Sequence, residues 1–335
     1  MSRATTSRPD ADYWAGYRFT PRLIAAAATG VWVVESHLPL LARIDPGSGA
    51  VSGPRRVGHG DPAGRGAHDL LSDSGAVWIR WNDGITRFDP KAEEERWIDL
   101  SAAGLAVGDA GVWALTGDGR LARVEDDGGG FEPVGESEVR RHSIAVGHGA
   151  VWALTWTHVP TGSTLARIDP ASGRVEGQLK IQGSPRQLLI DSDALYVRVW
   201  RRDARDNVEE LLLVVDPAGV SPRGELGVSP AGAGGTVLDG VVWAPDVDPY
   251  VHKERGAPCS VRRIDARSGD LLGSVELPGT ITAMVPGPAG VWGCLELRDA
   301  GAGAVIGVTA EGDSTTMVEL HDVDVSEHLP SRPHP

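Results

Sequence analysis

Short apolar runs alternate with turn residues along most of the chain, and residues 142–183 show the pattern most clearly. Four runs there have the length of one strand, and Gly, Asp, Pro or Ser bounds each of them. The runs are Ser143–Val146, Ala150–Thr155, Thr164–Ile168 and Arg174–Ile181. The pattern predicts a four-stranded antiparallel meander, which cannot bury both of its faces unless further copies pack against it.

An aromatic residue in the second run recurs along the chain and divides it into seven repeats. These repeat aromatics are Trp32, Trp78, Trp113, Trp152, Tyr196, Trp243 and Trp292. Their spacing of about 35 to 49 residues, with four predicted strands in each repeat, is typical of a β-propeller. Helical repeats of similar length are excluded because no repeat has apolar residues at a helical period. The sequence therefore predicts an all-β fold, a seven-bladed β-propeller of four-stranded antiparallel blades.

A second motif follows the aromatic in each repeat and marks the third strand and the turn after it. Its clearest copies are the LARIDP segments Leu41–Pro46 and Leu165–Pro170. The Asp accepts local backbone hydrogen bonds and a following Gly tolerates positive φ, so each copy predicts a turn into an outer strand. We expect an N-terminal extension over residues 1–20, the propeller over residues 21–320 and a C-terminal tail over residues 321–335. Four predicted strands in the seventh repeat complete that blade without a strand from the N-terminus, and pairing of residues 11–20 with its outer edge is the alternative.

The small-Val-Trp, LARIDP and Ser-Gly-Arg-Val motifs resemble the repeats of the streptogramin B lyase-like and YVTN-type bacterial propellers, over about residues 20 to 320. The resemblance implies the propeller fold, and among activities it implies a lyase. Enzymes similar to streptogramin B lyase use a histidine and a magnesium ion held by acidic residues late in the ring of blades. His252 and Glu296 stand in the late blades here. The Asp-x-x-Ser-Gly turn also resembles pyrroloquinoline-quinone-type repeats, but the Trp that closes those repeats is missing, so we expect no such cofactor.

The amino-acid composition argues against several classes of binding partner. The formal net charge of -14 offers no basic surface for nucleic acid or anionic lipid. Residues 1–20 lack the apolar core of a signal peptide, and no run approaches the roughly 18 apolar residues that span a bilayer. Two cysteines, Cys259 and Cys294, are too few for a disulfide framework. We therefore expect a cytoplasmic protein with two free thiols and no nucleic-acid or membrane partner.

The start of the innermost strand and the end of the second strand surround one mouth of a propeller's channel, which is a common binding site. Ten residues before the repeat aromatics stand Arg22, His68, Ala103, His142, Arg186, Ala233 and Thr282. Imidazoles suit acid–base chemistry, and guanidiniums suit a carboxylate, a phosphate or a developing oxyanion. The candidate catalytic residues are therefore His142, His68, Arg186 and Arg22. Alternatively, these are solvated loop residues, or a register slip turns them into a blade interface.

Three further tryptophans, Trp81, Trp156 and Trp200, follow the repeat aromatics but are not part of the repeat. Indoles at loop mouths form flat apolar walls, so these residues favour a hydrophobic or aromatic ligand. Packing between neighbouring loops is the alternative. Glu35 and His158 stand at the same end of the second strand and complete the candidate substrate-binding set.

We expect no cofactor, and a divalent cation such as Mg²⁺ is the alternative that some side chains would suit. Asp246, Asp248, His252 and Glu296 offer oxygen and nitrogen donors in blades six and seven, although their spacing matches no defined metal motif. The segments 201–210 and 246–258 are the longest connections between second and third strands and predict a rim on one side of the mouth. A solvated hairpin tip is the simpler interpretation of the first.

Two functions fit these features. The first is an enzyme that acts on a hydrophobic or aromatic small molecule at the channel mouth by His and Arg acid–base chemistry, as a lyase, cyclase or isomerase. The second is a non-catalytic propeller that binds a ligand or a protein partner on the same face, because the fold alone does not select a function. The chain contains no Gly-x-Ser-x-Gly and no His-Glu-x-x-His motif, so serine hydrolysis and zinc proteolysis have no support.

Overall fold

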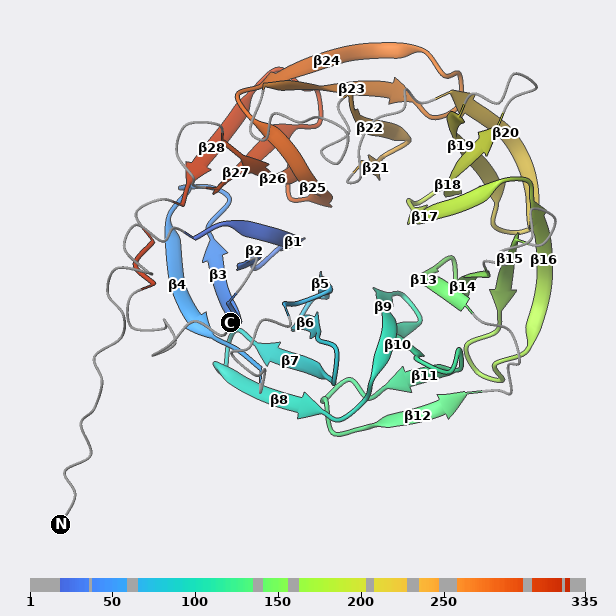
Figure 1. Cartoon of the computed structure of the whole chain (residues 1–335), viewed down its shortest axis with the longest axis horizontal. Coiled ribbons are helices and arrows are strands. Elements are labelled where there is room, and N and C mark those ends of the chain that lie inside the picture. Colours follow the sequence, from blue (N-terminus) through green and yellow to red (C-terminus); the bar gives the residue numbers. More distant parts are fainter. Residues whose placement is uncertain are drawn as a thin grey trace.

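Seven four-stranded antiparallel sheets form a ring around a central channel (Figure 1). The structure is a computed structural model that describes residues 19–35, 38–58, 66–134, 141–155, 163–202, 208–227, 235–246, 258–297, 303–320 and 323–325. Each sheet contains four consecutive strands, so every blade is one contiguous segment of the chain. The chain is therefore a seven-bladed β-propeller, as its repeats predict. Within the described ranges, no helix is long and apolar enough to cross a membrane.

The strands follow one another from the channel outwards in each blade. Blades 1 to 4 contain β1 (Pro21–Ala27), β2 (Gly30–Glu35), β3 (Leu40–Ile44), β4 (Val51–Arg56), β5 (Asp69–Ser72), β6 (Val77–Arg80), β7 (Ile85–Asp89), β8 (Glu94–Ile98), β9 (Ala102–Gly108), β10 (Gly111–Thr116), β11 (Leu121–Val124), β12 (Phe131–Val134), β13 (Arg141–Gly147), β14 (Ala150–Thr155), β15 (Ser163–Ile168) and β16 (Val175–Ile181). Blades 5 to 7 contain β17 (Ser184–Ile190), β18 (Leu195–Arg202), β19 (Val208–Asp216), β20 (Ser221–Gly227), β21 (Thr236–Leu238), β22 (Val241–Pro245), β23 (Cys259–Asp265), β24 (Leu271–Leu277), β25 (Thr280–Gly287), β26 (Gly290–Glu296), β27 (Gly303–Thr309) and β28 (Thr315–Glu319).

The two faces of the ring differ in the connections that they carry. Innermost strands begin at one face, which we call the mouth face, and the second strand of each blade returns to it. The opposite face carries the tight turns between first and second strands and between third and fourth strands, and we call it the turn face. Residues at the start of β1, β5, β9, β13, β17, β21 and β25 therefore share the mouth face.

Hydrophobic clusters lie between consecutive blades, because each sheet has two apolar faces and must bury both. The repeat aromatics contribute one side chain to each of the seven clusters, and none of them is more than 5% exposed. Trp152, for example, packs between blades 4 and 5, and its indole N–H donates to the carbonyl of Gly147 at 3.0 Å. The repeat aromatics thus hold neighbouring blades together, and their side chains are buried in these interfaces.

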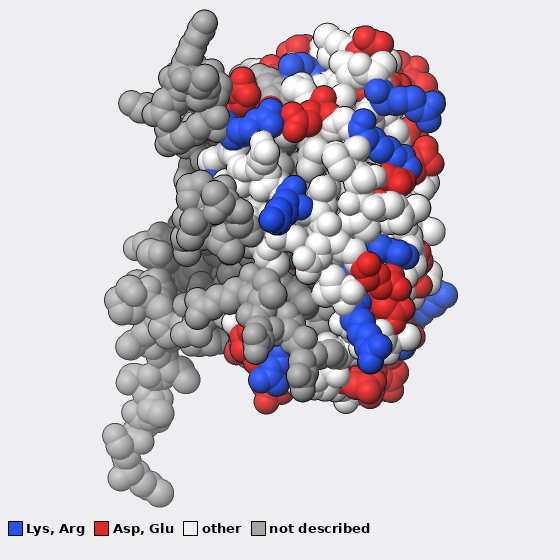
Figure 2. Space-filling model, turned by 90° about the vertical axis from the view of Figure 1, so that its right-hand side faces the viewer, with Lys and Arg blue, Asp and Glu red and all other residues white. Residues whose placement is uncertain are grey.

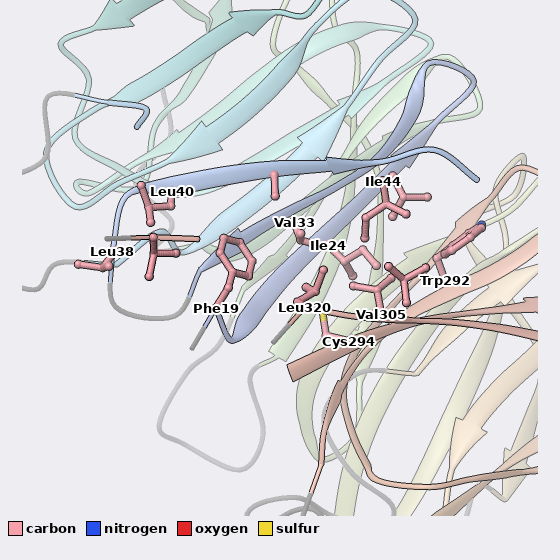
Figure 3. Close-up of a cluster of buried hydrophobic side chains, with 14 residues drawn as sticks. Phe19, Ile24, Val33, Leu38, Leu40, Ile44, Trp292, Cys294, Val305 and Leu320 are labelled. Atoms are coloured by element: carbon pink, nitrogen blue, oxygen red, sulfur yellow. The ribbon is translucent and has the colours of Figure 1, made fainter. Parts of the chain in front are cut away.

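Blade 7 closes the ring by packing against blade 1 (Figure 3). Ile24 and Val33 of blade 1 share one cluster with Trp292 and Cys294 of blade 7. Within the described residues, the seventh sheet consists of β25 to β28, the four strands that its sequence pattern predicts. In this part of the chain, blades 7 and 1 are joined by buried side chains and share no strand. Residues 11–18 lie outside the description.

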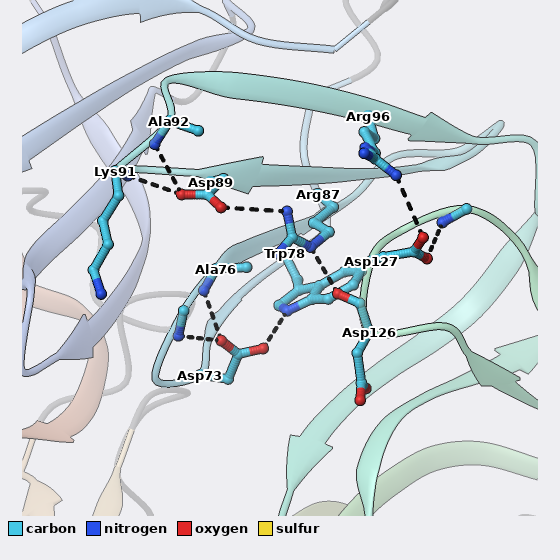
Figure 4. Close-up of polar contacts among 12 residues, drawn as sticks. Asp73, Ala76, Trp78, Arg87, Asp89, Lys91, Ala92, Arg96, Asp126 and Asp127 are labelled. Carbon is cyan, nitrogen blue, oxygen red and sulfur yellow. Dashed lines mark hydrogen bonds and ion pairs between the residues drawn. The ribbon is translucent and has the colours of Figure 1, made fainter.

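The arginine of the LARIDP motif, which we call the repeat arginine, lies opposite the repeat aromatic on the neighbouring strand. In blade 2, Arg87 pairs with Trp78 across β6 and β7, and its Nε donates to the carbonyl of Asp126 in blade 3 at 2.8 Å (Figure 4). In blade 6, Arg263 lies over the Trp243 ring and its Nη2 donates to the carbonyl of Ala310 in blade 7 at 2.7 Å. In blades 2 and 6 the repeat arginine therefore connects its own blade to a turn of the next one. In blade 1, by contrast, Nε of Arg43 donates to the carbonyl of Thr29 in its own blade at 2.8 Å.

One predicted loop is shorter than expected. The sequence predicts that residues 201–210 form a charged connection between two strands. In the structure, β18 continues to Arg202 and β19 begins at Val208. Arg201 lies opposite Glu209 in this extension, and opposite charges across strands favour the pairing. The hairpin of blade 5 is therefore longer than its apolar pattern indicates.

On the side of the ring shown in Figure 2, basic and acidic side chains are interspersed over the described surface. Outer strands supply much of this surface, since β16 and β20 are largely exposed. The described part of this side gathers no continuous basic patch.

Candidate functional site

A β-bulge interrupts the innermost strand near its start in five blades. The residue left without a partner across the hairpin is Arg22, Ala103, His142, Arg186 or Thr282. These are five of the seven positions that align ten residues before the repeat aromatics. The pairing thus makes these positions structurally equivalent, and bulges of this kind redirect side chains next to functional sites.

The bulges turn side chains out of the blade interfaces. Arg22 and Arg186 are exposed, whereas Pro21 and Pro185, the residues before them, are buried. Ala103 is likewise exposed. The innermost strands line the channel, and Arg22 and Arg186 stand near the starts of β1 and β17, at the mouth face.

His68 stands immediately before β5 and is also exposed. Its backbone N–H donates to the carbonyl of Arg80 at 2.8 Å, which continues the pairing of β5 with β6 to the mouth face. The imidazole Nε2 lies 2.6 Å from Oδ1 of Asn82. An amide oxygen only accepts hydrogen bonds, so this contact places the proton on Nε2 and leaves Nδ1 of a neutral imidazole as an acceptor.

Arg186 stacks on Trp200 within blade 5. The guanidinium carbon lies 4.0 Å from the centre of the indole ring, a close cation–π contact. Trp200 is half-buried at the end of β18. This stacking fixes a permanently charged, planar group beside an aromatic surface at the mouth face.

Ion pairs surround this part of blade 5. Arg198 donates to Glu210; the Glu210 side chain is buried and that of Arg198 is mostly buried. Arg201 makes two hydrogen bonds to Glu225, at 2.9 and 3.1 Å, and these bonds raise its pKa. Paired arginines are held by their carboxylates, so the stacked Arg186 is the guanidinium of this group that remains directed to the mouth.

Two candidate substrate-binding residues lie in the packed interior. Trp81 is 1% exposed, packs in the cluster between blades 1 and 2, and donates its indole N–H to Oγ1 of Thr86 at 2.8 Å. Glu35 is 1% exposed and accepts the backbone N–H of Leu38. Side chains buried in this way have no surface to offer a ligand, so both are left out of the site.

The candidate metal ligands are only partly described. Both oxygens of Asp246 accept hydrogen bonds from Ser260, from its N–H at 2.8 Å and its hydroxyl at 2.6 Å. Glu296 ends β26 and is partly exposed. Among the described residues, no group of three or more His, Cys, Asp or Glu side chains could hold a metal ion. Asp248 and His252 lie outside the described residues.

Three further candidate site residues are described only in part or not at all. Trp156 and His158 lie outside the described residues, and for His142 the description covers the backbone only. The equivalence of His142 with Arg22 and Arg186 therefore rests on strand pairing.

An ion pair at the mouth of blade 2 was not expected from the sequence. Arg80 Nε and Asp69 Oδ2 lie 2.5 Å apart, and Asp69 also accepts the backbone N–H of Leu105 in blade 3 at 3.2 Å. Arg80 in turn donates to the carbonyl of Ala102 at 3.1 Å. The pair fixes the strand that follows His68. The sequence could have indicated this ion pair, because the pairing of β5 with β6 places Asp69 opposite Arg80.

No protein-family model and no curated protein sequence matches the chain. Solved structures that resemble it include hydrazine synthase from Kuenenia stuttgartiensis, at 12% identity and a TM-score of 0.64, with 97% of this chain and 100% of that chain covered. The WD40 domain of Pan2 from Neurospora crassa is 12% identical with a TM-score of 0.59, covering 84% of this chain and 87% of that one. BamB from Moraxella catarrhalis is 12% identical with a TM-score of 0.52, covering 89% and 84%. At such identities these likenesses show the β-propeller fold alone.

Proposed function

We propose that this propeller is an enzyme that binds a small organic anion with a hydrophobic or aromatic portion at the mouth face and acts on it by acid–base chemistry. The observation that supports the proposal most is the shared bulge of the innermost strands, which turns Arg22 and Arg186 outward at equivalent positions. Two exposed arginines at equivalent positions in a chain of net charge -14 are a local attraction for an anion.

Binding is assigned to blade 5. The in-plane N–H groups of Arg186 suit a carboxylate or phosphate, and the indole of Trp200 beside them suits an aromatic or aliphatic portion. Arg22 supplies a second positive charge from blade 1.

Proton transfer is assigned to His68. With Nε2 donating to Asn82, the free Nδ1 of the neutral imidazole is the base that removes a proton from carbon next to the bound anionic group. The guanidiniums stabilise the negative charge that develops there. His142 occupies the equivalent bulge in blade 4 and is the second candidate acid or base. Elimination, cyclisation and isomerisation all fit this set, and no step depends on a metal ion.

Calorimetric titration with a panel of aryl carboxylates and aryl phosphates, against the matching neutral amides, tests the binding step. Arg186→Ala should weaken an anionic probe about tenfold, since a charged hydrogen bond contributes about 1.5 to 3 kcal/mol. Lys180→Ala, which removes one positive charge from the exposed outer strand β16, is the matched control and should bind normally. Equal affinity of Arg186→Ala and the unchanged protein would remove this site from consideration.

Mass spectrometry of probes that bind tests the chemistry. His68→Gln should keep the affinity and lose the product, because Gln retains polarity at the mouth but is not a base at neutral pH. Unchanged product formation in both His68→Gln and His142→Gln would contradict the enzymatic role.

A binding protein without catalysis is the second candidate, and the Arg186–Trp200 stacking favours it because that pair binds an anion without any titratable partner. In that case a bound probe is recovered unchanged from the protein and from every variant.

A further inference from the structure

A groove of about 610 Å³ lies on the turn face at the end of blade 3. In each blade we call the turn between the first two strands the inner turn and the turn between the last two strands the outer turn. Both turns of blade 3 line the groove, together with the inner turn of blade 2 and the outer turn of blade 4. Its volume is in the range of small-ligand sites. The groove is on the opposite face of the ring from Arg186 and His68, so it is independent of the proposed function.

The repeat arginine of blade 3, Arg123, lines this groove and has no partner. The other four repeat arginines are held in place. A carbonyl of its own blade accepts from Arg43, and a carboxylate of its own blade pairs with Arg167. Arg87 and Arg263 donate to the outer turn of the next blade. Arg123 is exposed, and among the described residues it makes no hydrogen bond or ion pair.

The form of the outer turn in the next blade accounts for this difference. In blades 3 and 7, whose outer turns accept from Arg87 and Arg263, a glycine N–H donates to the carbonyl three residues earlier. In blade 4, the N–H of Gly173 donates to the carbonyl of Asp169, four residues earlier. Within the described chain, no carbonyl of this wider turn accepts from Arg123, so its guanidinium remains available in the groove.

Gly111 leaves open space between this guanidinium and a carboxylate. A Cβ at Gly111 would lie 3.9 Å from Nε of Arg123, 4.0 Å from its Nη2 and 4.0 Å from Oδ1 of Asp126. The φ of Gly111 is 95°, which L side chains rarely adopt, so the backbone itself favours glycine here. The carboxylate of Asp126 is exposed and points away from Arg87, which contacts only the Asp126 carbonyl (Figure 4). Arg123 and Asp126 therefore border the same space without forming an ion pair.

The other charged residues of the groove are engaged. Asp109 accepts the backbone N–H of Gly149 at 2.9 Å, and Asp73 accepts the indole N–H of Trp78 at 2.8 Å. Arg87 is bound to the outer turn of blade 3. The lining thus offers one cation and one anion that lack partners in the described part of the chain, which favours a ligand that carries both charges.

We propose that this groove binds a free α-amino acid in its zwitterionic form. The carboxylate of the ligand accepts from Arg123, and its ammonium group donates to Asp126, so that both contacts are charge-assisted hydrogen bonds. An α-amino acid carries the two charges on one carbon and its neighbour, so it fits the small space over Gly111. Pro170 and Ala171 of the neighbouring outer turn offer an apolar surface to an aliphatic side chain.

Calorimetric titration with L-leucine tests the proposal. Two neutralised derivatives are the controls: L-leucinamide keeps the ammonium group and lacks the carboxylate, and N-acetyl-L-leucine keeps the carboxylate and lacks the ammonium group. L-Leucine should bind at least about tenfold more tightly than either, because charge-assisted hydrogen bonds are about twice as strong as neutral ones. Equal affinity of L-leucine and either derivative, or no binding of L-leucine, would overturn the assignment.

Two substitutions at exposed positions test the two contacts separately. Arg123→Gln should weaken L-leucine about tenfold and leave L-leucinamide unchanged, since that probe has no carboxylate. Asp126→Asn should weaken L-leucine to a similar extent and leave N-acetyl-L-leucine unchanged. This opposite selectivity distinguishes lost contacts from a general loss of structure. Arg56→Gln, at an exposed position on β4 of blade 1, is the matched control and should bind L-leucine normally. Unchanged affinity of Arg123→Gln or of Asp126→Asn for L-leucine would refute the site.

Discussion

The guanidinium carbon of Arg186 lies 4.0 Å above the indole ring of Trp200, and the two residues come from neighbouring strands of one blade. Stacking uses the flat face of the guanidinium, so the N–H groups in its plane stay directed away from the indole. An arginine held in this way loses little side-chain freedom when it binds a ligand. The Arg186–Trp200 pair is thus preorganised for binding an anion.

The Trp200→Leu substitution distinguishes the effect of positioning Arg186 from the effect of its positive charge. Leucine keeps apolar bulk but offers no π face, so Arg186 retains its charge and loses its fixed position. We expect anionic probes to bind about three- to tenfold more weakly, with the same dependence on salt concentration as for the unchanged protein. Calorimetric titrations at several salt concentrations measure both. A changed salt dependence with unchanged affinity would argue against positioning by Trp200.

Removing a repeat arginine should weaken the contact between two blades. Arg263→Ala loses the stacking on Trp243 and the hydrogen bond to Ala310, and we expect a loss of about 1 to 3 kcal/mol in the free energy of unfolding. Urea denaturation measures it. Arg174→Ala, at an exposed position in the turn of blade 4, should change stability by less than about 0.5 kcal/mol. Similar effects of the two substitutions would show that the repeat arginine is no more than a surface residue.

The two thiols should be unreactive in the folded protein. Burial raises the pKa of Cys259 and of Cys294, and Cys294 is fully enclosed in the cluster that closes the ring. Because the thiolate is the reactive form, a chromogenic thiol reagent should modify neither cysteine in buffer and both in urea. Rapid modification of Cys294 in buffer would indicate that blades 7 and 1 separate readily.

Stability should fall with acid through the turn aspartates. Hydrogen bonds from the hydroxyl and backbone N–H of Ser172 hold the pKa of Asp169 below its ordinary value of 3.8, and the N–H of Ser48 does the same for Asp45. A carboxyl group whose pKa is lowered by folding stabilises the fold above its unfolded pKa, and this contribution is lost as pH falls through the folded pKa. The loss therefore begins near about pH 4 and continues below it.

Asp169→Asn tests this linkage, because asparagine keeps an acceptor for Ser172 but does not titrate. Urea denaturation between about pH 6 and pH 3 should show a smaller loss of stability for this variant than for the unchanged chain. A pH dependence identical in both would show that Asp169 makes no contribution in acid.

Much of the fold could be predicted because each sequence repeat packs against the next one in the same way. Each repeat aromatic needs a neighbouring blade to cover it, so seven copies indicate seven interfaces. The strands of blade 4 differ from their predicted ranges by at most two residues at any end, as for β13 (Arg141–Gly147) against Ser143–Val146. Bulge positions also follow from the repeat, since Arg22 and Arg186 stand at the same distance from Trp32 and Tyr196.

The environment of side chains beyond the strand ends could not be predicted in this way. Trp81 comes after the end of β6 and has no place in the strand period; residues as far back as Gly58 pack over it. That contact joins segments distant in sequence, and no local pattern encodes it.

Closure by side-chain packing has a consequence for the order of the blades in the chain. None of the described strands is shared between two blades, and Phe19 and Leu320 lie in the same cluster. A circular permutant that joins the present ends and opens the chain between two blades would therefore break no sheet. Which blade comes first in the chain is then set by where the chain is opened, while each blade keeps its own two neighbours in the ring.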